Sequence, residues 1–183
     1  MQFVCINERC FAANCIPLLI QQNVDGSNFF NRSWAEFKAG FNDSRGNYWL
    51  GNELLSKLTR QVRYKLRFDL RKINSNIWYW AEYSTFRVAD ETSNYTLHVA
   101  GYTSNIVTTA DSLGYSNGMM FSTYDRDNDL SSKNCAAYNG GGFWYNNCAR
   151  CNVNTVRGRG ENFRWTYSTG IYLQTSRMWL TCQ

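Results

Sequence analysis

Three carboxylates lie within five residues in the segment FSTYDRDNDLSSKNC (121–135), at Asp125, Asp127 and Asp129. In an extended or looped chain, a spacing of two residues turns their side chains towards one side. Neighbouring carboxylates repel one another, so the arrangement is costly unless a cation neutralises it. Ligands that are all oxygens suit a hard cation such as calcium. The segment therefore indicates a calcium site, with a solvated acidic turn as the alternative.

Neither an EF-hand nor a histidine-based catalytic site fits these carboxylates. Counted from Asp125, the sixth position of an EF-hand requires Gly and here is Leu130, and the twelfth requires Glu and here is Ala136. The single histidine, His98, lies in a strand-like segment away from the acidic loop, so no histidine-based triad can be assembled. We therefore expect a binding protein and not an enzyme.

Two short helices are predicted ahead of the acidic segment. Ser33 and Glu36 form the pattern of a capping box, and Phe37 and Phe41 follow at helical spacing. The segment GNELLSKLT (51–59) repeats this spacing with its leucines on one face.

A sheet and a long loop region are predicted to follow. The segment YKLRFDLR (64–71) alternates strictly between apolar and polar residues, as in a strand with one buried face and one wet face. The segments 76–90 and 94–102 continue this pattern, and from about residue 103 the chain becomes rich in Gly, Asn, Ser and Asp. The sequence thus predicts an α+β fold with a twisted antiparallel sheet, short helices and a long loop-rich region.

The composition predicts a single secreted domain. The chain has 183 residues, 44% of them hydrophobic, which is enough to bury one core. Seven cysteines suggest disulfides and an oxidising compartment, and the odd count leaves at least one thiol unpaired or intermolecular. Sequons at Asn31, Asn42 and Asn94 fit a secreted glycoprotein. The first residues lack the pattern of a signal peptide, so we expect a mature or trimmed chain.

Charge and hydropathy argue against two classes of partner. The net charge of +5 is scattered along the chain without a dense basic run, so nucleic-acid binding is not expected. The apolar runs are far shorter than a bilayer requires, so no membrane span is expected.

The run NGMMFSTYDRDNDLSSKNCAAYNGGGFWYNNC (117–148) resembles the signature of the fibrinogen C-terminal-like domain. This family includes the fibrinogen globular regions, ficolins, tachylectins, angiopoietins and invertebrate fibrinogen-related lectins. The segments 24–41 and 48–59 resemble its opening motifs, and LQTSRM (173–178) resembles its closing strand.

The resemblance covers roughly residues 16–181. It implies a fibrinogen C-terminal-like domain at residues 16–183, with a cysteine-rich N-terminal segment at residues 1–15.

The resemblance also implies a calcium site with two carboxylates and two backbone carbonyls. Counted back from the cysteine that closes the loop, these are the carboxylates of Asp127 and Asp129 and the carbonyls of Ser131 and Lys133. Asp125 would not contact the ion itself and would instead orient the residues that do. Calcium is thus the expected cofactor.

Beside the calcium loop, the resemblance implies a ligand pocket. Cys135 and Cys148 match the family's disulfide, and a cis peptide bond is expected between Asn147 and Cys148. In acetyl-binding members, backbone N–H groups of this turn meet the acetyl carbonyl, and aromatic rings surround the methyl group. The ligand-binding residues carried over are Tyr145, Asn147, Cys148, Ala149, Trp165 and Tyr167. Ordinary core packing is the alternative for each aromatic ring, and Ala149 stands where many acetyl-binding members have His.

The remaining cysteines leave their pairing open. Cys151 and Cys182 are extra relative to the family pattern and are candidates for a second disulfide. Cys5, Cys10 and Cys15 lie where the family has a fuller opening subdomain, and one of them is a candidate for a link between chains in a homo-oligomer.

Together these features predict a secreted, calcium-dependent pattern-recognition lectin of innate immunity. Its expected ligands are acetylated glycans or other microbial surface components, such as those of the bacterial cell wall. The alternative is a protein-binding module, acting as a receptor ligand or in a fibrin-like assembly.

Overall fold

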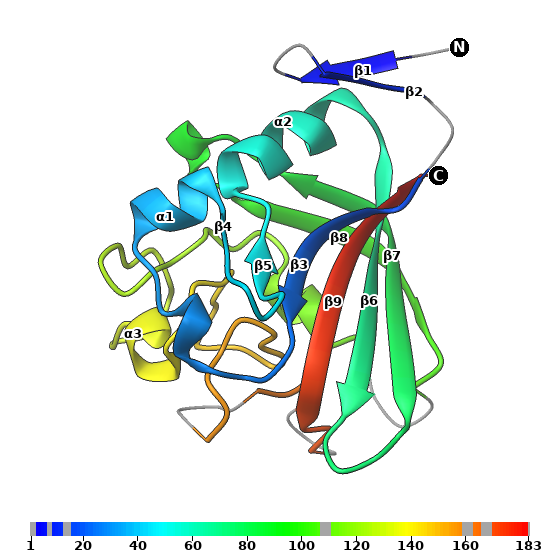
Figure 1. Ribbon diagram of the computed structural model, residues 1–183. Coiled ribbons are helices and arrows are strands. Elements are labelled where there is room, and N and C mark those ends of the chain that lie inside the picture. The colour runs from blue at the N-terminus through cyan, green and yellow to red at the C-terminus, as the bar shows by residue number, and fades with distance from the viewer. Residues whose placement is uncertain are drawn as a thin grey trace.

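The computed structural model describes residues 3–6, 9–12, 16–106, 111–158, 163–165 and 170–182, and of residues 3–6, 9–12 and 182 it describes the backbone alone. Its framework is a seven-stranded antiparallel sheet with the strand order β4-β5-β3-β9-β6-β7-β8 (Figure 1). The strands are β3 (Leu18–Asn23), β4 (Phe41–Asn42), β5 (Tyr48–Trp49), β6 (Tyr64–Lys72), β7 (Trp78–Val88), β8 (Leu97–Ser104) and β9 (Leu173–Cys182). The last of them, β9, occupies the central position between β3 and β6.

Short helices and a separate hairpin complete the described chain. The hairpin pairs β1 (Phe3–Ile6) with β2 (Arg9–Ala12). The helices are α1 (Trp34–Ala39), α2 (Asn52–Gln61) and α3 (Cys135–Asn139), with 3-10 turns at Asn28–Phe30, Glu91–Ser93 and Leu113–Ser116. The predicted α+β fold is confirmed. None of the described helices is both long enough and apolar enough to cross a bilayer.

The capping box predicted from the sequence starts α1. The Glu36 carboxylate accepts a hydrogen bond from the Ser33 backbone N–H at 2.9 Å, and the Ser33 hydroxyl accepts one from the Glu36 N–H. The helix ends at Ala39, so the prediction that Phe41 continues it is wrong. Gly40 adopts a positive φ of 89°, and a Cβ there would lie 2.5 Å from the Leu50 carbonyl oxygen, so the chain leaves the helix at this point.

Strand alternation gives the sheet a covered face and an open face. On β6, Leu66, Phe68 and Leu70 are fully buried, whereas the charged residues between them are partly exposed. Phe68 packs against Trp165 of the loop region, with 4.7 Å between ring centroids. The helices and long loops therefore cover one face of the sheet, as Figure 1 shows.

An aromatic cluster joins the loop region to the helices. Phe121 lies at the start of the acidic loop, and its ring centroid is 5.1 Å from that of Phe37 and 5.2 Å from that of Trp144. The Trp144 indole N–H donates a hydrogen bond to the Tyr95 carbonyl at 2.8 Å. The acidic loop thus starts from a fixed point in the core.

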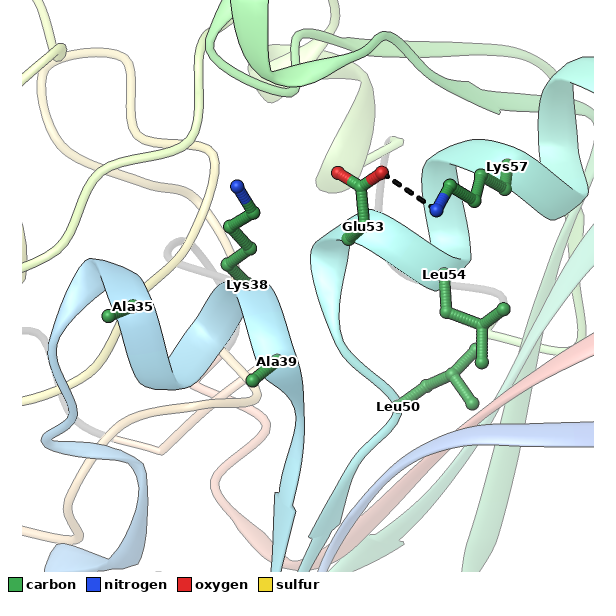
Figure 2. A pocket seen from close by; sticks show the side chains of 7 residues that line it. All are labelled: Ala35, Lys38, Ala39, Leu50, Glu53, Leu54 and Lys57. Atoms are coloured by element: carbon green, nitrogen blue, oxygen red, sulfur yellow. Dashed lines mark ion pairs between the residues drawn. The ribbon is translucent and has the colours of Figure 1, made fainter. Parts of the chain in front are cut away.

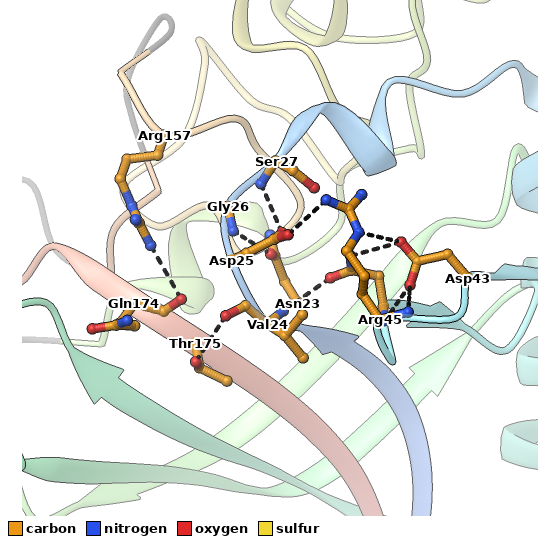
Figure 3. A network of polar contacts seen from close by, with 11 residues as sticks. Asn23, Val24, Asp25, Gly26, Ser27, Asp43, Arg45, Arg157, Gln174 and Thr175 are labelled. Carbon is orange, nitrogen blue, oxygen red and sulfur yellow. Dashed lines mark hydrogen bonds and ion pairs between the residues drawn. The ribbon is translucent and has the colours of Figure 1, made fainter.

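Asp43 organises the turn between β4 and β5. Its carboxylate accepts hydrogen bonds from the backbone N–H groups of Arg45 and Asn47, at 3.0 and 2.9 Å. The Arg45 guanidinium forms ion pairs with both Asp43 and Asp25 (Figure 3). The Asn47 side chain accepts a hydrogen bond from the Val24 N–H, so this network ties the turn to the segment after β3.

Replacing Asp43 with Asn is expected to lower stability at neutral pH, and the difference should disappear in acid. Burial raises the pKa of Asp43, but hydrogen bonds from Asn47 and Arg45 outweigh it, so the pKa lies below its ordinary value of 3.8. A carboxylate with a lowered pKa stabilises the fold above its unfolded pKa, and this contribution is lost as the pH falls through the folded pKa. Thermal unfolding of both proteins from neutral pH down to about pH 2 measures the effect. A gap in melting temperature that stays constant over this range would contradict it.

Candidate functional site

The acidic loop is held at both ends by hydrogen bonds that involve backbone groups. Ser122 and Phe143 exchange N–H to carbonyl bonds of 2.9 and 3.2 Å. At the far end, the Asn134 side chain accepts a hydrogen bond from the Ala137 N–H and caps α3. The loop between them therefore has fixed ends.

Two of the three carboxylates predicted from the sequence lie side by side. The Asp127 carboxylate accepts a hydrogen bond from the Asp129 backbone N–H at 3.3 Å. The Asp129 carboxylate accepts from the N–H groups of Ser131 and Cys135, at 2.8 and 2.9 Å. Burial raises the pKa of Asp129 and the nearby Asp127 carboxylate raises it further, while the two backbone hydrogen bonds oppose this shift. The two carboxylates are close enough to repel one another.

Asp125 faces a different part of the molecule. Its Oδ1 accepts hydrogen bonds from the Trp34 backbone N–H at 2.9 Å and from the Thr123 hydroxyl at 2.7 Å. Since Trp34 is the first residue of α1, Asp125 ties the acidic loop to this helix.

The oxygen donors of this loop are of the type that a hard cation prefers. No described donor bonds to the carbonyl oxygens of Ser131 or Lys133, so both are free to act as ligands. The Lys133 ammonium lies 4.4 Å from the centroid of the Tyr138 ring. Within the described residues there is no group of three or more Asp, Glu, His or Cys side chains that could hold a metal, so a cation here would depend on backbone oxygens. Such a donor set suits calcium.

A disulfide-closed turn lies directly beside this loop. The predicted disulfide between Cys135 and Cys148 is present, with 5.5 Å between the Cα atoms. The Leu130 N–H of the acidic loop donates to the Asn146 carbonyl at 3.1 Å, which joins loop and turn. The described residues contain no cis peptide bond, so the prediction of one between Asn147 and Cys148 is wrong. The Asn146 N–H reaches the Cys148 carbonyl at 2.7 Å with the peptide bonds trans, the geometry that non-proline residues prefer.

The turn presents unused backbone donors. Among the described residues, no acceptor bonds to the N–H of Asn147 or of Cys148. Asn147 is exposed, whereas Cys148 and Ala149 are nearly buried. The Asn147 donor therefore lies on an exposed residue, whereas the Cys148 donor lies on a buried one.

The aromatic residues carried over as pocket walls lie in the core. Tyr145 and Trp165 are both 0% exposed. The Tyr145 hydroxyl donates to the Gly141 carbonyl at 2.7 Å and accepts from the Asn152 side chain at 2.8 Å. Tyr167 lies outside the described residues. Tyr145 and Trp165 are thus packed in the core, which was the alternative for these rings. A ligand could reach them only if the surrounding residues moved.

A third ring, which the sequence did not single out, lies beside the turn. The Tyr115 hydroxyl donates to the Asn147 carbonyl at 3.4 Å, and the Arg150 guanidinium lies 4.7 Å from its ring centroid. Tyr115 precedes the signature run in the chain, and no spacing rule connects it to the turn. Three further large apolar side chains are exposed on the loop and on α3: Tyr124, Leu130 and Tyr138. Exposure in a loop has no period, so the sequence carries no signal for them.

The other predicted sites remain predictions. Cys151 is buried, and the side chains of Cys182, Cys5 and Cys10 lie outside the description, as does Cys15 altogether. Backbone register places Cys5 opposite Cys10 in the hairpin.

Of the three sequons, Asn42 is exposed, while Asn31 and Asn94 are partly buried. The Asn94 amide nitrogen, to which a glycan would attach, lies 3.1 Å from the Met120 sulfur.

A groove of about 380 Å³ lies elsewhere, between α1 and α2 (Figure 2). It is lined by Ala35, Lys38, Ala39, Leu50, Glu53, Leu54 and Lys57. None of the predicted ligand-binding residues belongs to it. Its lysines are already engaged, because Lys57 pairs with Glu53 and Lys38 pairs with Glu91.

Comparison with known proteins gives matches over most of the chain. The family model for the C-terminal globular domain of fibrinogen beta and gamma chains matches residues 12–181. The chain is 41% identical to human Ficolin-3 over 137 residues, which cover 75% of this chain and 45% of Ficolin-3. It is 38% identical to Fibrinogen-like protein A of Apostichopus parvimensis over 157 residues, which cover 84% of this chain and 52% of that protein. The chain thus spans about half the length of these two relatives.

Solved structures match over nearly the whole chain. The fibrinogen-like globe domain of human ANGPTL2 superposes with a TM-score of 0.80 at 34% identity and covers 99% of this chain and 91% of its own. The lamprey fibrin D-dimer, in complex with the peptide ligand Gly-His-Arg-Pro-amide, gives a TM-score of 0.74 at 28% identity over 98% of this chain and 63% of its own.

Proposed function

Because the chain belongs to the family of fibrinogen C-terminal globular domains, we propose that it is a secreted recognition domain that binds acetylated glycans with the help of calcium. The N–H groups of Asn147 and Cys148 support this function most directly, since they are unused donors on a turn fixed by a disulfide. We expect binding without turnover.

Calcium would act through the acidic loop. The carboxylates of Asp127 and Asp129 and the carbonyls of Ser131 and Lys133 would hold the ion, which would neutralise the repulsion between the carboxylates. The hydrogen bond from the Leu130 N–H to the Asn146 carbonyl would then fix the turn in place when the loop is ordered. Calcium would thereby shape the ligand site without touching the ligand.

An acetyl group fits the chemistry of the turn. Its carbonyl oxygen would accept hydrogen bonds from the N–H groups of Asn147 and Cys148. Tyr115, whose hydroxyl reaches the Asn147 carbonyl, offers an apolar ring beside these donors for the methyl group. Acetylated glycans of microbial surfaces are the ligands we propose.

Peptide binding is the second candidate, and the exposed side chains of the loop and of α3 favour it. Leu130 is 63% exposed, and Tyr124 and Tyr138 are each 47% exposed. Aromatic side chains, tyrosine among them, are enriched in protein interfaces. The fibrin D-dimer that shares this fold carries a peptide ligand. The same loop would then hold a segment of a partner protein.

Binding to immobilised acetylated albumin and to untreated albumin, in calcium and then in EDTA, tests the first candidate. We expect acetyl-selective binding that EDTA abolishes and that free N-acetylglucosamine competes away. Asp127→Asn should weaken calcium binding, measured by calorimetry, about tenfold or more because one ligand charge is lost. Asp125→Asn is the matched control, since it removes a charge from the same loop but keeps an oxygen for Trp34 and Thr123.

Three results would count against this function. Equal binding to both albumins, or none, would overturn the acetyl assignment and favour the peptide candidate. An equal loss of calcium affinity in both variants would place the ion elsewhere in the loop. Binding that EDTA leaves unchanged would remove calcium from the site.

A further inference from the structure

The open face of the sheet carries tryptophans interleaved with cations. Because Leu66, Phe68 and Leu70 of β6 point into the core, the residues between them lie on the opposite face. The same alternation applies to the neighbouring strands β7 and β9, which flank β6 (Figure 1). We call this surface the Trp–Arg face and define it by Lys65, Arg67, Arg71, Trp78, Trp80, Arg177 and Trp179.

Strand register brings these side chains together. Arg67 lies opposite Trp179 of β9, and Arg71 lies opposite Trp78 of β7. Two cation–π contacts cross the face, with the Arg67 guanidinium 5.5 Å from the centroid of the Trp80 ring and the Arg177 guanidinium 5.7 Å from that of Trp78. Trp78 is nevertheless 44% exposed. The rings are thus held in place but remain accessible.

Positive charge remains after the local ion pairs are made. The carboxylates of Asp69 and Glu82 both bind Arg67, at 2.9 and 2.8 Å. No described carboxylate lies within ion-pair distance of Lys65, Arg71 or Arg177. These cations form an unneutralised group around the tryptophans.

Neutral acceptors position two of these cations without cancelling their charge. Arg71 donates to the Asn76 side chain at 3.1 Å, and Arg177 donates to the Gln22 side chain at 2.8 Å. Two further donors on these strands, Arg71 Nε and Trp179 Nε1, have no described acceptor but are buried, so a ligand would reach them only after a side-chain movement. The cations that pair with no described carboxylate, Lys65, Arg71 and Arg177, therefore make this face complementary to an anionic ligand that is rich in oxygen.

We propose that the Trp–Arg face binds an anionic polysaccharide, a glycan that carries sulfate or carboxylate groups. Guanidinium groups bind such anions through paired hydrogen bonds. The apolar face of a sugar ring packs on an indole ring. Neighbouring strands lie about 4.8 Å apart, so the cations and rings form a regular array along which a linear polysaccharide can bind. Trp and Arg are also enriched in protein interfaces. The cations of Lys65, Arg71 and Arg177, which no described carboxylate pairs, favour an anionic chain over a protein surface. This site is separate from the acidic loop and needs no calcium.

Heparin, as the sulfated probe, and neutral dextran of matched length test this inference by titration at physiological salt, with tryptophan fluorescence as the readout. We expect heparin to bind and dextran not to bind. The double variant Arg71→Ala/Arg177→Ala should weaken heparin binding about tenfold or more, because two charge-assisted contacts are lost. Trp78→Ala should also weaken it.

Matched variants separate a specific site from general attraction. Lys57→Ala/Arg60→Ala removes the same charge from α2, and we expect it to change heparin affinity less than about threefold. Arg71→Lys/Arg177→Lys keeps the charge but loses the planar guanidinium, and it should bind less tightly than the wild type. EDTA and Asp127→Asn should leave heparin binding unchanged, which keeps this test independent of the proposed acetyl site.

Several outcomes would overturn the inference. If Lys57→Ala/Arg60→Ala loses as much heparin affinity as Arg71→Ala/Arg177→Ala, heparin binding depends only on the net charge of the protein. A single-stranded oligonucleotide that binds as tightly as heparin, with the same dependence on Arg71 and Arg177, would point to nucleic acid instead. If the wild type is a dimer that Trp78→Ala dissociates while heparin affinity is unchanged, the face is an interface between copies of this chain.

Discussion

Replacing Gly141 with alanine is expected to lower the free energy of unfolding by about 3 kcal/mol or more. A Cβ at this position would lie 1.7 Å from the Asn154 carbonyl oxygen and 2.7 Å from its carbonyl carbon. Both are backbone atoms, so no side-chain rotation can relieve the contact. The Gly141 carbonyl also accepts the Tyr145 hydroxyl, and the Asn154 side chain donates to the Gly142 carbonyl at 3.1 Å. The two segments cannot separate without losing these hydrogen bonds.

Gly118→Ala is the control for this change. Gly118 has a positive φ of 79°, and nothing lies within 4 Å of the position of its Cβ. Its substitution should cost only the backbone strain, about 1–2 kcal/mol. Urea unfolding of both variants and of the wild type measures the difference. If Gly141→Ala is no less stable than Gly118→Ala, the close approach between residues 141 and 154 is not present in solution.

Truncation of Trp144 to alanine should cost about 4 kcal/mol, the size typical of a large buried ring. Trp144 is 0% exposed and packs against Phe121, Trp49 and Phe143. Trp144→Phe should cost less, about 2 kcal/mol, because it keeps a ring but leaves the Tyr95 carbonyl without its donor.

The exposed Trp78 supplies the comparison for this second prediction. Trp78→Ala should change the free energy of unfolding by less than about 1 kcal/mol, because nearly half of this side chain is already in water. Denaturant midpoints for the three variants check the order Trp144→Ala, Trp144→Phe, Trp78→Ala. A Trp78 variant as unstable as Trp144→Ala would show that the open face contributes to the core.

Local patterns in the sequence predict the local elements well. The alternation of residues 64–71 identifies β6, since a strand with one buried face has a period of two. The capping box at Ser33 and Glu36 identifies the start of α1, since it depends on residues three apart. Such patterns involve only residues close together in the chain, so they can be recognised without knowledge of the fold.

Contacts between residues that are far apart in the chain could not be predicted from the sequence. The pairing of β9 with β3 and β6 joins residues more than 100 positions apart. Asp125 bonds to Trp34, which lies 91 positions away, and so it is separated from the other two carboxylates despite their regular spacing. The burial of Tyr145 likewise follows from its contacts with Gly141 and Asn152, and an aromatic ring in a loop gives no sign of whether it faces ligand or core.

The central position of β9 has a consequence for how this domain is made on the ribosome. Strands β3 and β6 emerge early, but each has a side that only β9 can pair, and β9 is synthesised last. Until then the nascent chain exposes two unpaired strand edges, which are templates for aggregation. Non-local pairing of this kind also slows folding. The sheet can close only after β9 has been synthesised, so the edges of β3 and β6 stay unpaired until nearly the whole domain has emerged.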